Sequence, residues 1–304
     1  MAQLLAHGDE AESIGWAVQT GPLVGLLIAA AAYALLVAAA ARRGQPVPLA
    51  RTVSFYGGLA VVGLALFSPL DPFGESQSVS AHMLQHELLL MVAPLLLVAG
   101  VDQRVTVPVT RRVLGPALRT RAWRVGLAVV GHPVVVTVAW CAMVLGWHVP
   151  VFYDLALDND TVHIVEHSCL LTVGLGFWAV VIGRLPSVHR TTAGQRVGAL
   201  GVAMAASGAL GAILLWAPRL LYPEYAEGQP WFGLTALHDQ RFAGALMMAV
   251  DMPLLLGAAV FATARWARQE ARLTSHGRQP LGVPAQNNSH AGPVPLIQES
   301  MADG

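Results

Sequence analysis

Long apolar segments alternate with short polar connections along most of the chain. A helix that crosses a bilayer needs about 20 mostly apolar residues in succession. Seven segments meet this requirement, at about 22–41, 51–70, 79–100, 125–148, 162–183, 197–218 and 237–264. The pattern predicts an all-α integral membrane protein, a bundle of seven transmembrane helices.

The same pattern divides the chain into three parts. An N-terminal segment, 1–21, precedes the membrane domain, 22–264. The remaining tail, 265–304, becomes rich in Pro, Gly, Asn, Gln and Ser and shows little hydrophobic periodicity. A segment of this composition cannot bury enough apolar surface to fold, so the tail is predicted to be largely disordered.

The arginines indicate how the helices are oriented. All eighteen basic residues are arginine, and sixteen of them lie in alternate connections or after the last helix. Only Arg219 and Arg241 lie at the other ends of the helices, where the acidic residues gather. Because cytoplasmic connections carry the excess of basic residues, the N-terminus is predicted to lie outside and the C-terminus in the cytoplasm.

Composition agrees with a membrane protein and excludes other classes. The chain is 55% hydrophobic and 12% charged, whereas soluble domains carry about 25% charged residues. The formal net charge is zero, so no basic surface for nucleic acid is expected. Cys141 and Cys169 both lie inside apolar segments, which argues against a disulfide framework.

Histidines gather at one depth of the predicted bundle. Residues four apart on a helix share a face and are separated by about 6 Å. His82/His86 and His163/His167 are two such pairs, and facing helices with paired imidazoles can close a metal site. His148 ends one helix and His238 begins another at the same outer face. These two histidines are expected either to complete the ligand set of the predicted site or to lie at its entrance. The six histidines of this set are His82, His86, His148, His163, His167 and His238.

Other polar and soft side chains accompany the histidines. Glu166 is a metal ligand, an acceptor for an imidazole N–H, or a base, and the sequence leaves these roles open. Met83 and Cys141 are possible soft ligands, with core packing as the alternative.

Asp251 lies deep in the last helix, and three roles remain open for it: metal ligand, proton carrier and structural hydrogen-bonding group. At the mouth of that helix, Asp239 and Arg241 are expected to form an ion pair.

Four stretches together resemble the CtaG family of bacterial cytochrome c oxidase assembly factors. They are "SAHMLQH" (Ser80–His86), "GWHVPVFYDLAL" (Gly146–Leu157), "VHIVEH" (Val162–His167) and "LYPEYA…GLTALHDQRFAG" (Leu221–Gly244). The resemblance covers about residues 20–270 and implies that the six histidines are the polar signature of the family. Glu87 and Asp251 depart from it, since apolar residues are expected there.

The resemblance also implies a role and a location. It implies a multi-pass protein of the bacterial plasma membrane that contacts the lipid bilayer and, during assembly, cytochrome c oxidase subunits. Supply of copper to the oxidase is the role implied, with copper as the bound metal. No feature of the sequence requires a catalysed reaction, so the protein is expected not to be an enzyme.

Two other functions remain as alternatives. A seven-helix zinc hydrolase would use three histidines and Glu166 as base, although Leu90 occupies the place of the second histidine in an HExxH motif. A haem-binding membrane protein would use the histidine pairs as axial ligands, but about 6 Å along a helix is too little for two stacked haems. A retinal protein is excluded because the chain has no lysine.

Overall fold

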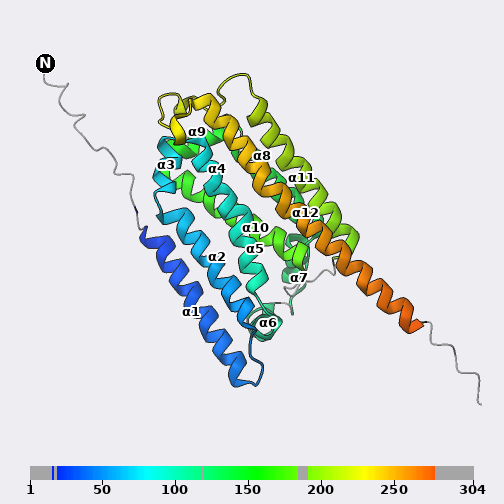
Figure 1. The fold of residues 1–304 in the computed structure, drawn as a ribbon. Coiled ribbons are helices and arrows are strands. Elements are labelled where there is room, and N and C mark those ends of the chain that lie inside the picture. The colour runs from blue at the N-terminus through cyan, green and yellow to red at the C-terminus, as the bar shows by residue number, and fades with distance from the viewer. Residues whose placement is uncertain (1–15, 17–18, 118, 184–190, 278–304) are drawn as a thin grey trace, which may run out of the picture. The chain divides into compact units, whose positions relative to one another are not determined.

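The computed structural model describes residues 16, 19–117, 119–183 and 191–277 (Figure 1). These residues form helices and connections, with no strand among them. Residues 1–15 and 17–18 of the predicted N-terminal segment, and 278–304 of the predicted tail, lie outside the described residues. Contacts divide the chain into two units, Met1–Thr263 and Ala264–Gly304, and the first holds the helices from α1 to α11.

Among the described residues, six helical segments are long and apolar enough to cross a membrane. The third is one continuous segment, Val79–Gly100, made of α4 (Val79–Glu87), the π-helical stretch η1 (Leu88–Val92) and α5 (Ala93–Gly100). A bent pair of helices is a candidate seventh. The described residues therefore confirm the all-α fold and provide six or seven candidate membrane spans. The other five helices are α1 (Thr20–Arg42), α2 (Leu49–Phe67), α10 (Asp160–Ile182), α11 (Ala193–Trp216) and α12 (Ala236–Gly277).

The predicted continuous helix over 125–148 is wrong, because the structure breaks it in two. α7 (Arg121–Val130) and α8 (Pro133–Trp147) meet at an angle of 55°. The residue before a proline is excluded from the helical region by the proline ring, and His132 accordingly has an extended ψ of 130°. Its Nδ1 accepts a hydrogen bond from the Val134 N–H at 3.3 Å and so caps α8.

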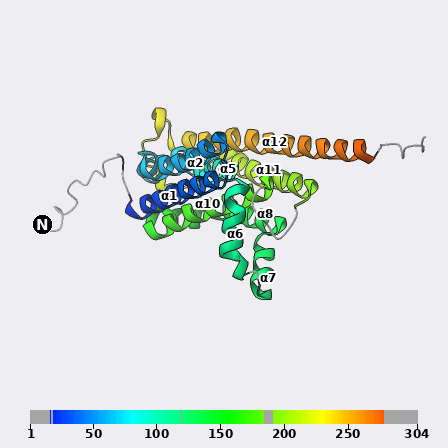
Figure 2. The same ribbon diagram turned by 90° about the horizontal axis from the view of Figure 1, so that it is seen from below.

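Short helices fill the connections between the spans. α3 (Leu70–Ser76) and α9 (Pro150–Asp158) lie beside the beginnings of α4 and α10 at one end of the bundle (Figure 1). α6 (Gln103–Ala117) lies toward the opposite end, and Figure 2 shows α6 and α7 running across the direction of the long helices. One end of the bundle is thus closed by helices that pack against α4 and α10. Two single-turn 3₁₀ helices follow α11, η2 (Pro223–Tyr225) and η3 (Trp231–Gly233).

The segment Val79–Gly100 is the centre of the bundle. About two thirds of its most apolar window is buried (67%), against 11% for α1. α10 crosses it closely at Gly174, where an added Cβ would collide with the Leu90 carbonyl oxygen and lie 2.8 Å from Pro94 Cγ. The Leu90 carbonyl belongs to the π-helical stretch, a kind of insertion that is frequent at functional sites. Glycine at this crossing lets α4 and α10 approach, so their histidine-bearing ends face each other.

A buried carboxylate fixes the beginning of α4. Asp239 of α12 accepts hydrogen bonds from the Ser80 hydroxyl at 2.5 Å, the Ser80 N–H at 3.2 Å and the Ser78 hydroxyl at 3.1 Å. The expected pair of Asp239 with Arg241 does not form, because Arg241 donates to the Ala217 carbonyl at 3.1 Å instead. Asp239 therefore anchors the helix that carries the first histidine pair.

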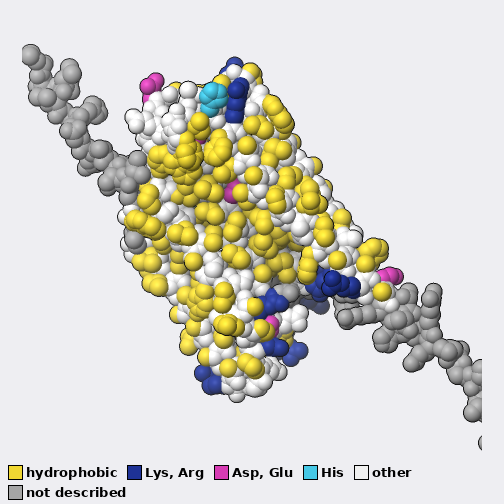
Figure 3. Space-filling model, in the orientation of Figure 1, with side chains coloured by type: hydrophobic (Ala, Val, Ile, Leu, Met, Phe, Trp, Pro, Cys, Tyr) yellow, Lys and Arg dark blue, Asp and Glu magenta, His cyan; other side chains and the backbone are white. Residues whose placement is uncertain are grey.

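The outer surface is consistent with a lipid environment. Figure 3 shows hydrophobic side chains across the middle of the visible face. Large apolar side chains that are more than half exposed include Leu27, Val53, Val138 and Ile213 on four different helices. Isolated apolar residues are common on soluble surfaces, but a continuous apolar face of this extent marks contact with a membrane or a partner.

Topology fusions test the predicted orientation of these helices. Reporters fused at Thr120, between α6 and α7, should indicate the cytoplasm, and reporters fused at Asn159 should indicate the exterior, because arginines flank the first position and acids the second. A fusion at Gln45, between α1 and α2, is the control and should agree with Thr120. Enzymatic activity of periplasm-active and cytoplasm-active reporters gives the readout. The same answer at Thr120 and Asn159 would overturn the orientation.

Candidate metal centre

Histidines from α4 and α10 converge at the closed end of the bundle. Ligand atoms of His82, His163, Glu166 and His167 all lie within 4.8 Å of one another. His86 joins them, with its Nε2 2.7 Å from that of His82. All five side chains are buried. The structure thus places the two histidine pairs of the sequence in one group, which we call the candidate metal centre.

Glu166 lies between the two helices at this centre. Its Oε2 is 3.8 Å from His82 Nε2, and its Oε1 is 3.6 Å from His86 Nε2. The rings of His163 and His167 stand 4.1 Å apart, centroid to centroid. Three nitrogen ligands and a carboxylate around one point are the donor set of many catalytic and transport metal sites.

Several of these atoms have no hydrogen-bond partner in the described part of the chain. They are the Nε2 atoms of His163 and His167, the Nδ1 atom of His86 and both carboxylate oxygens of Glu166. A buried polar atom left unpaired costs about 1–3 kcal/mol, so such a concentration calls for a partner. A metal ion bound among them would satisfy these atoms, and imidazole with carboxylate suits copper, zinc or iron. The residues present therefore fit a metal ion.

His148 and Met83 lie beside the centre as a second pair of donors. His148 Nδ1 lies 2.6 Å from the Val144 carbonyl, to which it donates, and this leaves the lone pair on Nε2. That Nε2 is 3.0 Å from the Met83 sulfur, and the ring is 5.7 Å from that of His86. His148 Nε2 and the Met83 sulfur can therefore both act as metal ligands.

The structure does not bring every candidate residue into this group. His238 is exposed, and its Nδ1 lies 3.0 Å from the Thr235 hydroxyl. Cys141 is a free thiol that packs, half-buried, against the main hydrophobic core. Both lie outside the group of ligand atoms that surrounds Glu166.

Asp251 and Glu87 form a separate buried cluster. Asp251 is 1% exposed and accepts a hydrogen bond from the Ser207 hydroxyl. The carboxyl group of Glu87 lies close enough to that of Asp251 for the two to interact electrostatically. The two residues that depart from the family pattern are thus neighbours, and neither belongs to the group around Glu166.

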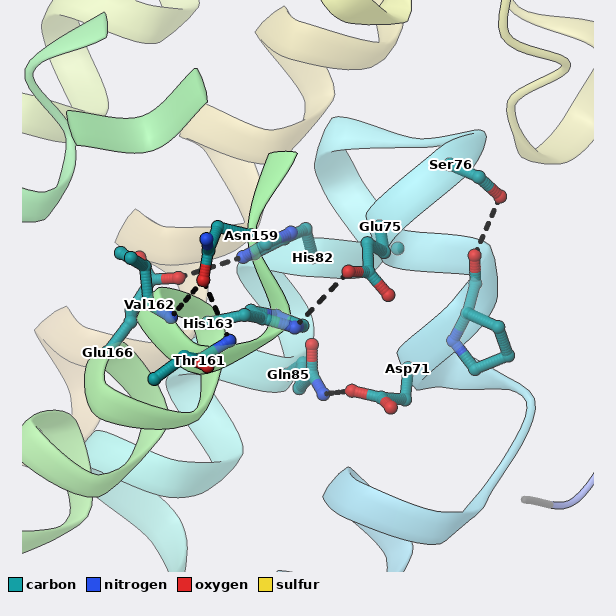
Figure 4. A network of polar contacts seen from close by, with 12 residues as sticks. Asp71, Glu75, Ser76, His82, Gln85, Asn159, Thr161, Val162, His163 and Glu166 are labelled. Atoms are coloured by element: carbon teal, nitrogen blue, oxygen red, sulfur yellow. Dashed lines mark hydrogen bonds and ion pairs between the residues drawn. The ribbon is translucent and has the colours of Figure 1, made fainter. Parts of the chain in front are cut away.

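Tyr225 and Glu75 contact the histidines and were not singled out from the sequence. The Tyr225 hydroxyl donates to the Gly74 carbonyl at 2.7 Å, and its oxygen lies 3.3 Å from His82 Nδ1. An N–H at Nδ1 then leaves the lone pair of His82 on Nε2, which lies beside His86 and Glu166. Glu75 Oε1 lies 3.4 Å from His163 Nδ1 (Figure 4). Tyr225 stands in the stretch "LYPEYA", so the family resemblance was the available signal for it.

Two polar contacts fix the helices that carry the centre (Figure 4). The Asn159 side chain accepts hydrogen bonds from the N–H groups of Thr161 and Val162 at 3.0 and 3.1 Å, and so caps α10. Asparagine is among the best residues for this position. Gln85 of α4 donates to Asp71 and, at 2.9 Å, to the Ala65 carbonyl. The cap and the Gln85 contacts set the positions of the two histidine pairs.

Comparisons with known proteins agree with the arrangement of these motifs. The profile of the family described as "Cytochrome c oxidase caa3 assembly factor (Caa3_CtaG)" matches residues 31–269. Two curated mycobacterial proteins, "Uncharacterized protein Mb0105" of Mycobacterium bovis and "Uncharacterized protein MT0111" of Mycobacterium tuberculosis, are each 26% identical over 259 residues. The match covers 82% of this chain and 39% of each relative, so the chain spans about two fifths of their length.

No solved structure matches the chain. The family profile nevertheless extends over well more than half of it, from within α1 to within α12, and includes all the stretches that carry the candidate metal centre. The chain therefore belongs to the Caa3_CtaG family of cytochrome c oxidase caa3 assembly factors.

Proposed function

We propose that this protein binds a copper ion at the candidate metal centre and supplies it to cytochrome c oxidase during assembly of the oxidase. Membership of an oxidase assembly family supports the assembly role. The observation that carries the metal role is the convergence of buried metal-ligand atoms that have no hydrogen-bond partner among the described residues: His163 Nε2, His167 Nε2 and the Glu166 carboxylate.

Copper is the metal that suits the whole donor set. Imidazole binds copper, zinc and iron, whereas thioether sulfur prefers Cu(I). The His148–Met83 pair, 3.0 Å between nitrogen and sulfur, adds a soft donor beside the imidazoles. A carrier also needs ligands that can be exchanged one at a time, and side chains from separate helices provide such a set.

The proposal includes a location. With the predicted orientation in the bacterial plasma membrane, the beginnings of α4 and α10 lie on the extracytoplasmic side. Copper would be held near that face and passed to an oxidase subunit in the same membrane. The protein acts in this proposal as a carrier and not as an enzyme.

A metal-dependent hydrolase is the second candidate, and one observation favours it. Both Glu166 oxygens lack a hydrogen-bond partner among the described residues while lying within the ligand group. A carboxylate beside a metal-bound water is the arrangement of a general base.

The haem alternative is disfavoured by the spacing of the histidine rings. Their centroids lie 4.1 to 6.2 Å apart, so the rings contact one another and leave no room for a haem between them.

Glu166→Gln separates the carrier from the hydrolase. As a carrier, the variant should lose copper affinity by about 10–100-fold, the usual effect of changing a group that supports metal ligands. Oxidase activity in a deletion strain complemented with the Glu166→Gln gene should fall together with the copper affinity. Copper affinity is measured in detergent by competition with a chelator of known affinity.

The neighbouring buried carboxylate provides the control for this variant. Glu87→Gln changes a residue on the same helix as His82 and His86, but one that contacts Asp251. Its copper affinity should match that of the unmodified protein. Full affinity in Glu166→Gln together with complete loss of function would favour the hydrolase, since a base is needed for turnover and not for binding.

A further inference from the structure

An apolar cavity of about 1280 Å³ lies between α1, α2, α5 and α10. We call it the lateral groove. At one end it is lined by Phe55, Leu97 and Val101, and at the other by acidic residues and two histidines of the candidate metal centre. Its lining on α10 consists of Asp160, His163, Ile164, His167, Leu171 and Leu175, with Ser168 between them.

The lateral groove is the side from which the candidate metal centre is reached. His163 and His167 line it and keep 7% and 8% of their surface exposed, and their Nε2 atoms have no hydrogen-bond partner among the described residues. Only 1% of the surface of His82 is exposed, and its ring packs against the buried ring of Tyr153, with the two centroids 5.1 Å apart. Two histidines of the candidate metal centre therefore form part of the groove wall, with their Nε2 atoms buried directly behind it.

The dimensions of the lateral groove suit a membrane-spanning helix. On α10 the lining runs over sixteen residues from Asp160 to Leu175, and the fifteen steps between them span about 22 Å at 1.5 Å per residue. On α2 it runs from Phe55 to Leu66. This length covers most of the roughly 30 Å of a bilayer's hydrocarbon core.

One wall of the lateral groove is made of small residues. Gly21, Gly25 and Ala29 recur every fourth residue on α1 and all line the groove. A Cβ added at either glycine would meet no atom within 4 Å, so this wall is open. Small residues at this spacing allow two helices to approach closely inside a membrane, where close packing is the main attraction between them.

Charge distinguishes between a helix and a lipid as the occupant. Asp71, Glu75 and Asp160 surround the end of the groove that holds His163. An anionic phospholipid placed with its chains in the groove would bring its phosphate against these carboxylates, which is unfavourable. A helix whose outer end is positively charged or carries metal ligands would be attracted there.

We propose that the lateral groove receives a transmembrane helix of the oxidase subunit that accepts the copper. The incoming helix packs on the Gly21–Gly25–Ala29 wall and places its outer end beside His163 and His167. Copper then passes sideways within the membrane to ligands on that subunit. This inference rests on the proposed function, because it names the partner for the same metal centre.

Gly25→Leu tests the lateral groove without touching a metal ligand. The new side chain has open space around its Cβ and fills the groove. Oxidase activity in the complemented deletion strain should fall about tenfold or more, because the helix contact is blocked. The copper content of the purified variant should stay unchanged. Gly201→Leu is the matched control, since Gly201 of α11 is also exposed with no atom within 4 Å, and it should leave both quantities unchanged.

Photo-crosslinking in living cells identifies the occupant. A benzophenone amino acid is placed at Ile164, which lines the groove, and in a second variant at Val165, which does not. The two side chains are similarly exposed, with 55% of the surface of Ile164 and 47% of that of Val165 accessible. The Ile164 probe should capture a transmembrane peptide of an oxidase subunit, identified by mass spectrometry, and the Val165 probe should not. Capture of phospholipid alone at Ile164, or full oxidase activity in Gly25→Leu, would overturn the docking proposal.

These outcomes separate docking from copper binding. If the protein binds no copper but the Ile164 probe still captures the oxidase subunit, the docking proposal stands and the copper proposal fails. If copper binds and histidine variants abolish oxidase activity while Ile164 captures no oxidase subunit, the copper proposal stands and the docking proposal is overturned.

Discussion

Removing either histidine pair should nearly abolish copper binding, and removing both pairs should cost little more. The reason is that His82, His163 and His167 share one point with Glu166, with ligand atoms no more than 4.8 Å apart. One remaining histidine pair with Glu166 would hold the metal far more weakly than the complete set. Losses from residues that serve one site are therefore strongly non-additive.

The experiment compares His82→Ala/His86→Ala, His163→Ala/His167→Ala and the quadruple variant. Copper per chain, measured by atomic spectroscopy after removal of free metal, should fall from about one to near zero in either double variant, and the quadruple variant should look the same. His238→Ala is the control, because this histidine is exposed and outside the group, and it should keep its copper. Two independent half-losses would mean two separate sites, and full copper content in the quadruple variant would exclude the site.

Deleting the gene should sharply lower cytochrome c oxidase activity while leaving transcription of the oxidase genes intact. The family to which the chain belongs assembles this oxidase, and the proposed copper transfer acts after the subunits are made. Activity should fall about tenfold or more in limiting copper, since mass action with ample copper can replace part of a carrier's work.

Complementation connects this effect to the metal centre. The unmodified gene should restore oxidase activity, and the His163→Ala/His167→Ala variant should not, provided that it is present in the membrane in equal amount. Oxidase activity is measured as oxidation of reduced cytochrome c by isolated membranes. Normal activity in the deletion strain at both limiting and ample copper would refute the assembly role of this protein and leave the hydrolase as the better candidate.

The helices and their sequence positions were predictable because the requirement that creates them is local. A backbone inside a bilayer must satisfy its own hydrogen bonds, so each apolar segment of sufficient length becomes a helix. Six predicted segments correspond to continuous helical segments, although α12 continues to Gly277, past the predicted end at residue 264. The break at His132 was missed because an average over about 20 residues hides a single Pro133, which nevertheless ends the helix.

The sequence also predicted that the two histidine pairs would lie close together. A spacing of four places both members of a pair on one face of a helix, and alternating helix direction places the beginnings of α4 and α10 at the same depth. Those two facts brought His82, His86, His163 and His167 into one hypothesis, and the structure places their rings within 6.2 Å of a neighbour in the group.

By itself, then, the sequence determined which segments are helices and which helix carries each polar side chain. Tertiary structure alone decided which way each helix is rotated about its axis, because rotation depends on packing between helices. The close crossing at Gly174 turns the histidines of α4 and α10 toward each other, whereas His238 is exposed at the surface of the bundle. The contacts of Tyr225, Glu75 and the His148–Met83 pair depend on the same rotations, and they join residues up to 151 positions apart. No local pattern specifies such contacts, because packing of the complete bundle brings these side chains together.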